Sequence, residues 1–333
     1  MTLQTLSNLF ADLARPPKST KGSSELSAIA IPGLGGHHVA RDSVDRAVLL
    51  IKTSSQVKSL PPPVRLENLA IDHDVYCRIW QGNTIIQEDH FTVLACLSSD
   101  IEIKNHFLNV AIPFLAYLGP SPQSDHVAHL LGVLTELFRA LSQPPRKSIQ
   151  GLWGELFLIS RAVDVETLIT CWHSDPNERY DFSSGNQRIE VKCALGATRR
   201  HHFSLEQVSP PVGARVIVAS ICTERIGGGT SVGDLLSTIR SALSGNSRLL
   251  LRLESVVAAT CGQSLGRALT DSFDIEIALD TLRFYNIETV PKPKGEIPLE
   301  VSDVRFRSDL SSQESIGMAF LEGQKLFQAV LSK

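Results

Sequence analysis

The chain reads YDFSSGNQRIEVKC over residues 180–193, the most informative stretch in its 333 residues. The run RIEVKC is typical of a short β-strand, in which side chains two apart, such as Glu190 and Lys192, project from the same face. The SSGN segment before it consists of turn-forming residues. The stretch therefore predicts a hairpin that brings Asp181, at the end of an extended segment, against Glu190.

Two carboxylates and an ammonium group in one place suit the hydrolysis of a phosphodiester. Mg²⁺ binds one or two carboxylates together with waters and phosphate oxygens, so Asp181 and Glu190 are a sufficient set of protein ligands. Lys192 beside them can orient the attacking water and neutralise charge that builds on phosphorus. In the alternative reading, Glu190 and Lys192 form an ordinary surface pair and Asp181 caps a turn.

The surrounding residues resemble the PD-(D/E)XK nuclease superfamily, specifically the bacterial PD-(D/E)XK motif proteins. The resemblance covers about residues 145–260. It implies a restriction-endonuclease-like mixed sheet flanked by helices, with Mg²⁺, or Mn²⁺ as a substitute, held by acidic side chains. Tyr180 stands where the motif has a proline, which is not a ligand. The matching segments are Gly151–Leu156 (GLWGEL), Asp181, Glu190–Lys192 (EVK) and His201–Gln207 (HHFSLEQ).

The resemblance also implies a role for each matching residue. Asp181 and Glu190 are the metal ligands, Glu155 is the acid of the preceding helix that supports the metal or its water, and Lys192 is the catalytic lysine. The helix that carries Glu155 has a core-facing apolar pattern with this residue on its flank. A solvated glutamate is therefore the alternative for Glu155.

Basic residues gather around the predicted metal site, as the phosphates of a nucleic acid would require. We expect them to contact DNA, and a solvated hairpin tip is the alternative. Either histidine of the pair is also a candidate to assist the leaving oxygen, next to packing or phosphate contact. The basic residues are Arg188, Arg199, Arg200, His201 and His202, and the family resemblance adds Ser204, Glu206 and Gln207 as secondary site residues.

Composition limits the other classes of protein. With 43% hydrophobic residues the chain has ample material for a folded core, and its net charge of −3 leaves nucleic-acid binding to local basic patches. The six cysteines have no metal-ligand spacing, so we expect buried thiols. The first residues lack the features of a secretion signal, and no apolar run is long enough to span a membrane, which predicts a cytoplasmic protein.

The pattern along the chain predicts fold class α+β or α/β, with two domains. Residues 1–120 form a β-rich domain for DNA or partner binding, and residues 121–333 form the nuclease domain with a C-terminal extension. The glycine-rich segment 33–36 predicts a mobile turn with His37 and His38 exposed after it, and segment 227–229 predicts a connecting turn. The polar stretch 15–24 predicts a loop. Strands are expected at 27–31, 47–52, 64–71, 75–80, 84–97, 215–222, 273–277, 282–290 and 301–307, and helices at 101–117, 125–142, around Glu155, from 232, at 248–260 and at 313–331.

The resemblance further implies bacterial restriction or phage defence, with an ATPase translocase and a methyltransferase as partners. Cutting both strands of a duplex favours a homodimer or a larger complex. Two alternatives stay open: a catalytically silent DNA-binding or scaffold subunit, and a nuclease acting on RNA or branched DNA. The intact Glu190–Lys192 pair argues against the silent subunit.

Overall fold

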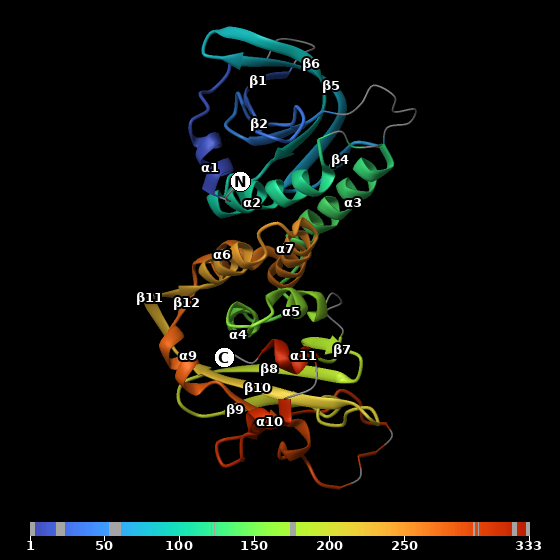
Figure 1. The fold of residues 1–333 in the computed structure, drawn as a ribbon, viewed down its shortest axis with the longest axis vertical. Helices are drawn as coiled ribbons and strands as arrows, with labels where there is room; N and C mark the ends of the chain where they lie inside the picture. Colours follow the sequence, from blue (N-terminus) through green and yellow to red (C-terminus); the bar gives the residue numbers. More distant parts are fainter. Residues whose placement is uncertain are drawn as a thin grey trace. The chain divides into compact units, whose positions relative to one another are not determined.

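A computed structural model describes residues 4–17, 24–52, 61–120, 122, 124–173, 178–295, 297–298, 300–321 and 325–330. The structure is α+β, and the chain divides into two compact units (Figure 1). The first unit is Met1–Pro144 with Gly245–Gly266, and the second is Pro145–Ser244 with Arg267–Lys333. This division differs from the predicted boundary after residue 120, because it lies further along the chain and gives each unit two segments.

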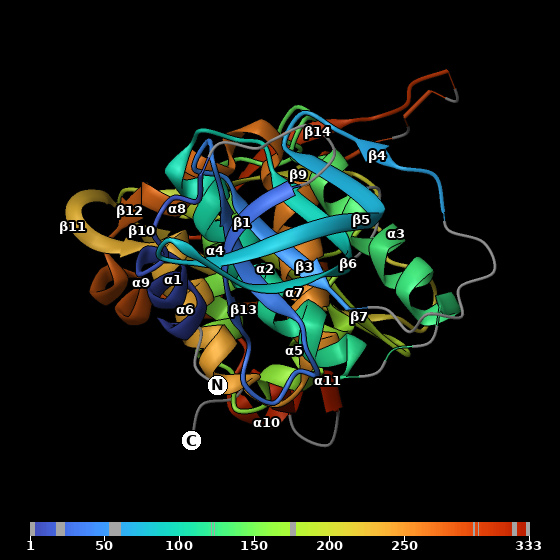
Figure 2. The ribbon, with the colours of Figure 1, turned by 90° about the horizontal axis from the view of Figure 1, so that it is seen from above.

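Six strands form the sheet of the first unit. Their order is β1-β2-β3-β6-β5-β4, and β1 also pairs with β5 in parallel, so that five of the strands close into a ring (Figure 2). Alternate side chains of these strands point into the ring and form its core, including Leu50 and Phe91. The strands are β1 (Ser24–Ala30), β2 (His38–Asp42), β3 (Ala47–Ile51), β4 (Val64–Arg65), β5 (Leu69–Gln81) and β6 (Thr84–Cys96).

The histidine pair after the glycine-rich turn corrects one expectation. His37 and His38 are buried rather than exposed, with 0% and 6% of their surfaces accessible. His37 Nδ1 accepts a hydrogen bond from the backbone of Lys52, and its Nε2 lies 3.0 Å from the carbonyl oxygen of Gly119. His38 begins β2, a strand that the sequence pattern did not predict. The polar stretch predicted as a loop falls largely on residues 18–23, outside the described residues.

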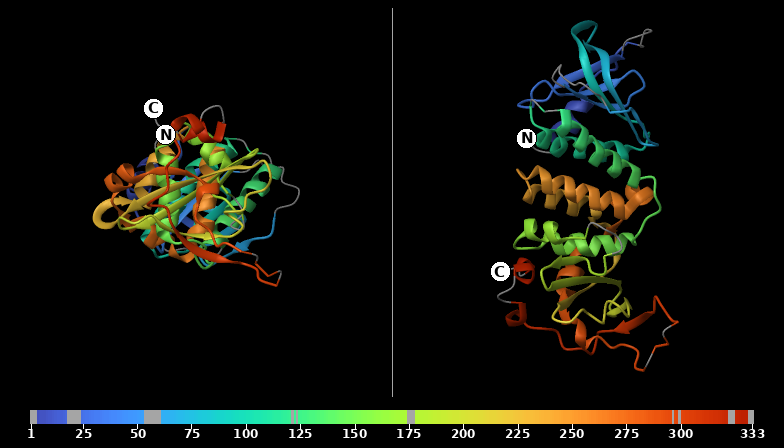
Figure 3. Two further views of the ribbon diagram at one scale, coloured as in Figure 1. Left: turned by 90° about the horizontal axis from the view of Figure 1, so that it is seen from below. Right: turned by 90° about the vertical axis from the view of Figure 1, so that its right-hand side faces the viewer.

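Helices complete the first unit. Asp100 caps α2 by accepting hydrogen bonds from the backbone of Glu102 and Ile103. α7 packs on both α2 and α3, although more than a hundred residues separate it from either helix in the chain. Its segment therefore belongs to this unit (Figure 3). The helices are α1 (Gln4–Ala11), α2 (Ile101–Leu118), α3 (Ser124–Ala140) and α7 (Ser247–Cys261), followed by the 3-10 turn η1 (Gly262–Ser264).

A four-stranded mixed sheet forms the centre of the second unit. Its order is β13-β10-β8-β7, with β8 and β10 parallel and the two outer strands antiparallel to their neighbours. α4 packs on β8, α5 on β7 and α9 on β10. The elements are β7 (Phe182–Ser184), β8 (Gln187–Leu195), β10 (Arg215–Thr223), β13 (Arg283–Asn286), α4 (Ile149–Ser160), α5 (Val165–Cys171), α6 (Val232–Ala242) and α9 (Ile275–Thr281). Helix α8 (Leu265–Thr270) begins in the last two residues of the first unit and continues into the second.

Two further strand pairs and several short elements lie in the same unit. β9 (Arg200–Ser204) pairs with β14 (Arg305–Asp309), and β11 (Arg225–Ser231) pairs with β12 (Ser272–Phe273). The glycines at 227–229 therefore belong to a strand instead of the expected turn. The prediction of a strand at 273–277 was wrong, because most of this segment belongs to α9. The strand expected at 282–290 is shorter than predicted: it forms β13 and is followed by a 3-10 turn, η2 (Ile287–Thr289). The long final helix is replaced by α10 (Met318–Leu321) and α11 (Lys325–Ala329), with 322–324 outside the described residues.

The cysteines agree with the expectation of thiols rather than disulfides. All six are free, four are buried and two, Cys171 and Cys193, are half-buried. None of the helices in the described ranges combines the length and the apolar character that a membrane crossing requires.

Candidate active site

The predicted hairpin forms, and it positions the first two acidic residues. Ser184 pairs with Gln187 across a two-residue turn in which Gly185 has a φ of +53°. The register continues through the pair Phe182–Ile189, so that Asp181 precedes β7 at the level of Glu190. Asp181 Oδ2 accepts a hydrogen bond of 2.8 Å from the backbone N–H of Val191. The turn and one backbone contact therefore fix the carboxylate beside β8.

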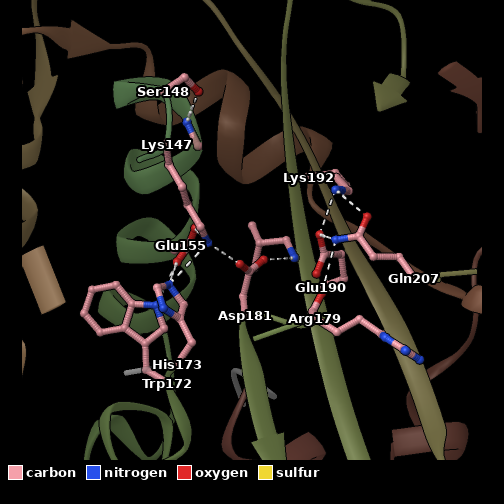
Figure 4. Close-up of polar contacts among 12 residues, drawn as sticks. Lys147, Ser148, Glu155, Trp172, His173, Arg179, Asp181, Glu190, Lys192 and Gln207 are labelled. Atoms are coloured by element: carbon pink, nitrogen blue, oxygen red, sulfur yellow. Dashed lines mark hydrogen bonds and ion pairs between the residues drawn. The ribbon is translucent and has the colours of Figure 1, made fainter. Parts of the chain in front are cut away.

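Glu190 and Lys192 lie side by side on β8, as their spacing predicted. Lys192 Nζ is 2.7 Å from Glu190 Oε1, and Gln207 donates from Nε2 to the same oxygen at 2.6 Å while its own Oε1 lies 3.3 Å from the Lys192 ammonium (Figure 4). Glu190 Oε2 is buried and has no hydrogen-bond partner within the described part of the chain. Burial, followed by repulsion from Asp181, raises the pKa of Glu190 to about 7. The positive charge near Glu190 does not compensate for its burial and for the repulsion from Asp181.

A second cluster meets the first at Asp181. Glu155 on α4 is 2% exposed, and Lys147 donates from Nζ to Glu155 Oε1 at 2.7 Å and to Asp181 Oδ1 at 2.5 Å (Figure 4). The other oxygen of Glu155 accepts from Trp172 Nε1 at 2.7 Å and lies 3.2 Å from His173 Nε2. Glu155 is thus a buried member of the site, which rules out the solvated glutamate considered from the sequence.

Electrostatics explain how these charges coexist in a buried place. Burial alone would raise the pKa of Glu155, but attraction by Lys147 and contact with His173 outweigh it and lower that pKa to about 2. Burial would likewise lower the pKa of Lys147, but Asp181 and Glu155 raise it above its usual value. Lys147 therefore stays charged and keeps Glu155 ionised.

The donor set fits a divalent cation. Glu155, His173 and Asp181 each offer one ligand atom, and these three atoms lie within 4.8 Å of one another. Asp181 also adjoins Glu190, whose free oxygen adds a further hard ligand. The Lys147 ammonium contacts the three residues of the cluster, at the position where a cation would bind.

Two residues of the site, Lys147 and His173, were not predicted from the sequence. Lys147 precedes α4, where Ser148 caps the helix, and His173 follows α5. Neither stands at a spacing that predicts a metal ligand. The backbone N–H of His173 donates to the carbonyl of Asp181 at 2.8 Å, a contact that the sequence does not reveal.

The predicted basic residues separate into two groups. A cavity of about 710 Å³ contains the carboxylates and Lys192 and is also lined by Arg200, His201 and His202. Arg188 and Arg199 do not line it. Arg188 donates to carbonyls of its own hairpin, and Arg199 donates to Ser220 and to the carbonyl of Thr281.

The two histidines of this segment differ sharply. His201 is buried, lies 2.7 Å from the hydroxyl of Ser220, and has its pKa lowered to about 3 by burial and by the charges of Lys192 and Arg199. His201 is therefore neutral at physiological pH. His202 is exposed at the cavity.

The secondary residues also separate by geometry. Gln207 contacts both Glu190 and Lys192 and belongs to the centre of the site. Ser204 exchanges hydrogen bonds with Gln207 through its backbone N–H and its hydroxyl, and so orients it. Glu206 is exposed and does not line the cavity. Ser204 ends β9, which pairs with β14 and with no strand of the four-stranded sheet.

Carboxylates from a helix and a hairpin, followed by the E-x-K pair of one strand, define the class of PD-(D/E)XK proteins, which in general are nucleases. The chain belongs to a family of this class: residues 6–311 match the family model DUF4420, described as "Putative PD-(D/E)XK family member". No curated protein and no solved structure matches the chain. Family membership agrees with the resemblance that the sequence motifs indicated.

Proposed function

We propose that the protein is a divalent-metal-dependent endonuclease that hydrolyses phosphodiester bonds of DNA, on a restriction-endonuclease-like second unit. The observation that supports this most is the convergence of Glu155, Asp181 and Glu190 with Lys192 in one cavity, with a buried oxygen of Glu190 left without a partner. Lys147 balances Glu155 and Asp181, whereas the buried oxygen of Glu190 still lacks a partner that a metal ion would supply. Mg²⁺, or Mn²⁺ in its place, is the ion that carboxylates select.

Each side chain has a role that follows from its position. Asp181 lies between the two clusters and, with Glu190 and Glu155, would hold the ion. When bound, a divalent ion supplies Lewis-acid polarisation of the phosphate and acidifies water at neutral pH. Lys192 is held by Glu190 and Gln207. Its ammonium group would orient the attacking water and stabilise the negative charge that develops on the phosphate oxygens.

The setting of this activity is proposed on family resemblance. We place the protein in bacterial restriction or phage defence in the cytoplasm, as a homodimer or in a complex with an ATPase translocase and a methyltransferase. The first unit would bind DNA or one of these partners. Activity on RNA or branched DNA, and a silent DNA-binding subunit, are the outcomes against which the proposal is tested.

A plasmid-cleavage assay with Mg²⁺ tests the proposal. Wild type is compared with Lys192→Ala and with Lys294→Ala, which removes an exposed lysine of the same unit outside the cavity. We expect wild type and Lys294→Ala to cut and Lys192→Ala to lose at least about 100-fold in rate, since loss of one electrostatic contact to the transition state costs this much. Equal cutting by the two lysine variants would reject the role of Lys192, and cutting of RNA alone would change the substrate.

A further inference from the structure

β14 places two arginines at the site, Arg305 and Arg307, that the sequence motifs do not identify. It lies more than a hundred residues after the E-x-K motif and pairs antiparallel with β9, with Arg305 opposite Ser204 and Arg307 opposite His202. Both arginines line the cavity that contains Glu190 and Lys192. We call this strand pair, Arg200–Ser204 with Arg305–Asp309, the β9–β14 ribbon.

The two faces of the β9–β14 ribbon differ in character. Arg305 and Arg307 on β14 are exposed, as are Arg200 and His202 on β9. Residues between them turn to the other face, where Phe203 is buried. The alternation of a β-strand therefore collects the cations on one face and the packing groups on the other.

The packed face holds the ribbon next to the catalytic lysine. The rings of Phe203 and Phe306 stack with their centroids 6.2 Å apart. The Lys192 ammonium lies 5.1 Å from the centroid of the Phe203 ring. This contact fixes the ribbon beside Lys192, and Arg305 and Arg307 on its other face line the cavity of the proposed chemistry, on a rigid element instead of a loose loop.

The charge on the ribbon is available to a ligand. Arg200 is paired with Asp309 at 3.1 Å, whereas no ion pair within 4.0 Å involves Arg305 or Arg307 among the described residues, although Arg305 is close enough to help lower the pKa of Glu206. Their Cα atoms, two positions apart on a strand, are about 6.6 Å from one another, a spacing comparable to that of successive phosphates. A guanidinium group binds a phosphate through two parallel hydrogen bonds.

We infer that the β9–β14 ribbon binds the phosphate backbone of duplex DNA beside the site, with Arg305 and Arg307 as its main contacts. This rests on the proposed function and specifies its substrate. Proteins that bind single strands stack bases on aromatic side chains, and the described residues that line the cavity include no Phe, Tyr or Trp. Arginines without aromatic partners suit a duplex, whose bases stay stacked and whose phosphates carry the affinity.

Measurements of DNA binding under conditions that prevent cleavage test the inference. A labelled 30-base-pair duplex and the matching single strand are titrated with the full-length protein in EDTA, by fluorescence anisotropy over a salt series. The variants are Arg305→Ala with Arg307→Ala, the corresponding Lys pair, and a control pair, Arg161→Ala with Arg283→Ala. The control removes two exposed arginines of the same unit that do not line the cavity. Plasmid cleavage with Mg²⁺ is measured in parallel.

We expect the Ala pair to lower the slope of log Kd against log salt by about 2, because each phosphate contact contributes about 1, and to weaken duplex binding at every salt concentration. The Lys pair retains most of the slope, which excludes misfolding as the cause, and the control pair binds like wild type. An unchanged slope in the Ala pair, while wild type still cuts DNA, would overturn the inference and leave the nuclease proposal intact. Equal wild-type affinity for single strand and duplex would also overturn it, and a wild type that neither binds nor cuts would overturn both.

Discussion

Lys147 sets the charge balance of the site at the scale of single side chains. It supplies an ammonium group to Glu155 and Asp181, two buried carboxylates that would otherwise face one another with no cation between them. A buried charge that loses its partner destabilises a fold by several kcal/mol. On the proposed function a divalent ion would take the same position, so it would compete with the lysine for these carboxylates.

Lys147→Met tests this competition. We expect the variant to be destabilised in EDTA by about 2 kcal/mol, a value discounted for the partial exposure of Lys147, since both carboxylates lose the ammonium group that balances their charge. We also expect Mn²⁺ to raise its Tm more than it raises that of wild type, because no ammonium must be displaced. Differential scanning fluorimetry with and without Mn²⁺ measures both effects.

Lys294→Met is the matched control, as an exposed lysine of the same unit. It should resemble wild type in both conditions. A Lys147→Met protein with an unchanged Tm in EDTA and an unchanged response to Mn²⁺ would contradict the competition.

Gln207 is the second residue for which the geometry makes a specific prediction. Gln207→Leu keeps the approximate size of the side chain but removes the hydrogen bonds to Glu190 and Lys192. Loss of partners that orient catalytic ligands lowers activity by about 10- to 100-fold. We expect this loss in plasmid cleavage with little change in Tm. Gln313→Leu, in the same unit and outside the cavity, should cut like wild type, and equal rates for the two variants would exclude an orienting role.

Cys193 should be unreactive although it lines the cavity. Burial raises the pKa of its thiol to about 12, so at pH 8 only about one thiol in 10,000 is the reactive thiolate. Because the folded-state pKa is raised, labelling by iodoacetamide should increase tenfold for each unit of rising pH below pH 12. Mass spectrometry of the labelled peptide, with and without urea, measures this. Native labelling at pH 8 as fast as in urea would contradict it.

At the scale of elements, the close approach of α4 to β8 positions Glu155. Gly154 on α4 faces β8 so closely that a Cβ atom built on it would lie 2.8 Å from the Cβ of Cys193. A side chain here has to push the helix away from the strand. The glycine therefore allows the distance at which Glu155 reaches the hairpin carboxylate through Lys147.

Gly154→Ala should consequently destabilise the protein by about 1–3 kcal/mol, the usual cost of overpacking a core, and reduce cleavage by shifting Glu155. Gly132→Ala on α3 is the control, because a Cβ there meets nothing within 4 Å. Alanine is the better helix former, so this variant should be stabilised by up to about 1 kcal/mol. Urea denaturation measures the change in the free energy of unfolding of both variants. A stabilised Gly154→Ala protein would contradict the packing argument.

Elements with strong local signals could be predicted from the sequence, and others could not. The hairpin carries its turn residues within four positions, and α2 and α7 have long apolar patterns, so all three were found. α9 was missed because Ile275 and Ile277 alternate with Glu276 as in a strand. Its capping residue decides otherwise, since Asp274 accepts hydrogen bonds from the backbone of Glu276 and Ile277.

The residues of the site divide in the same way, into those close in sequence and those brought together from distant segments. Glu190, Lys192 and Asp181 are linked by one hairpin, so their meeting follows from spacing. Lys147 and His173 arrive from the ends of two helices, and Arg305 arrives from a strand about a hundred residues further on. Such meetings depend on tertiary packing, which no spacing in a single sequence encodes.

At the scale of the whole molecule, the chain crosses between its two units three times. Segment 245–266 belongs to the first unit, where α7 supplies the surface on which α2 and α3 pack. A fragment of residues 1–144 lacks that surface. We expect it to unfold without a cooperative transition and to bind ANS, as measured by circular dichroism and fluorescence.

Adding α7 back should restore cooperativity. Gln263 donates from its backbone to the carbonyl of Gln143, so the C-terminal end of the α7 segment lies beside the end of the fragment. The start of α7 is then about 22 Å away, at 1.5 Å per residue, and a Gly/Ser linker of about 15 residues spans this distance with slack. A sharp transition in the fragment alone would contradict the assignment of α7 to this unit.

The ammonium group of Lys147 between the two carboxylates also affects whether the chain can fold before it binds a metal ion. A newly synthesised molecule can reach its native arrangement while free metal is scarce, because its own lysine already balances the acidic groups. Maturation and activation then become separate steps. The protein should consequently be purified intact in the presence of chelators, and on the proposed function it would stay in a resting form until an ion takes the place of the lysine.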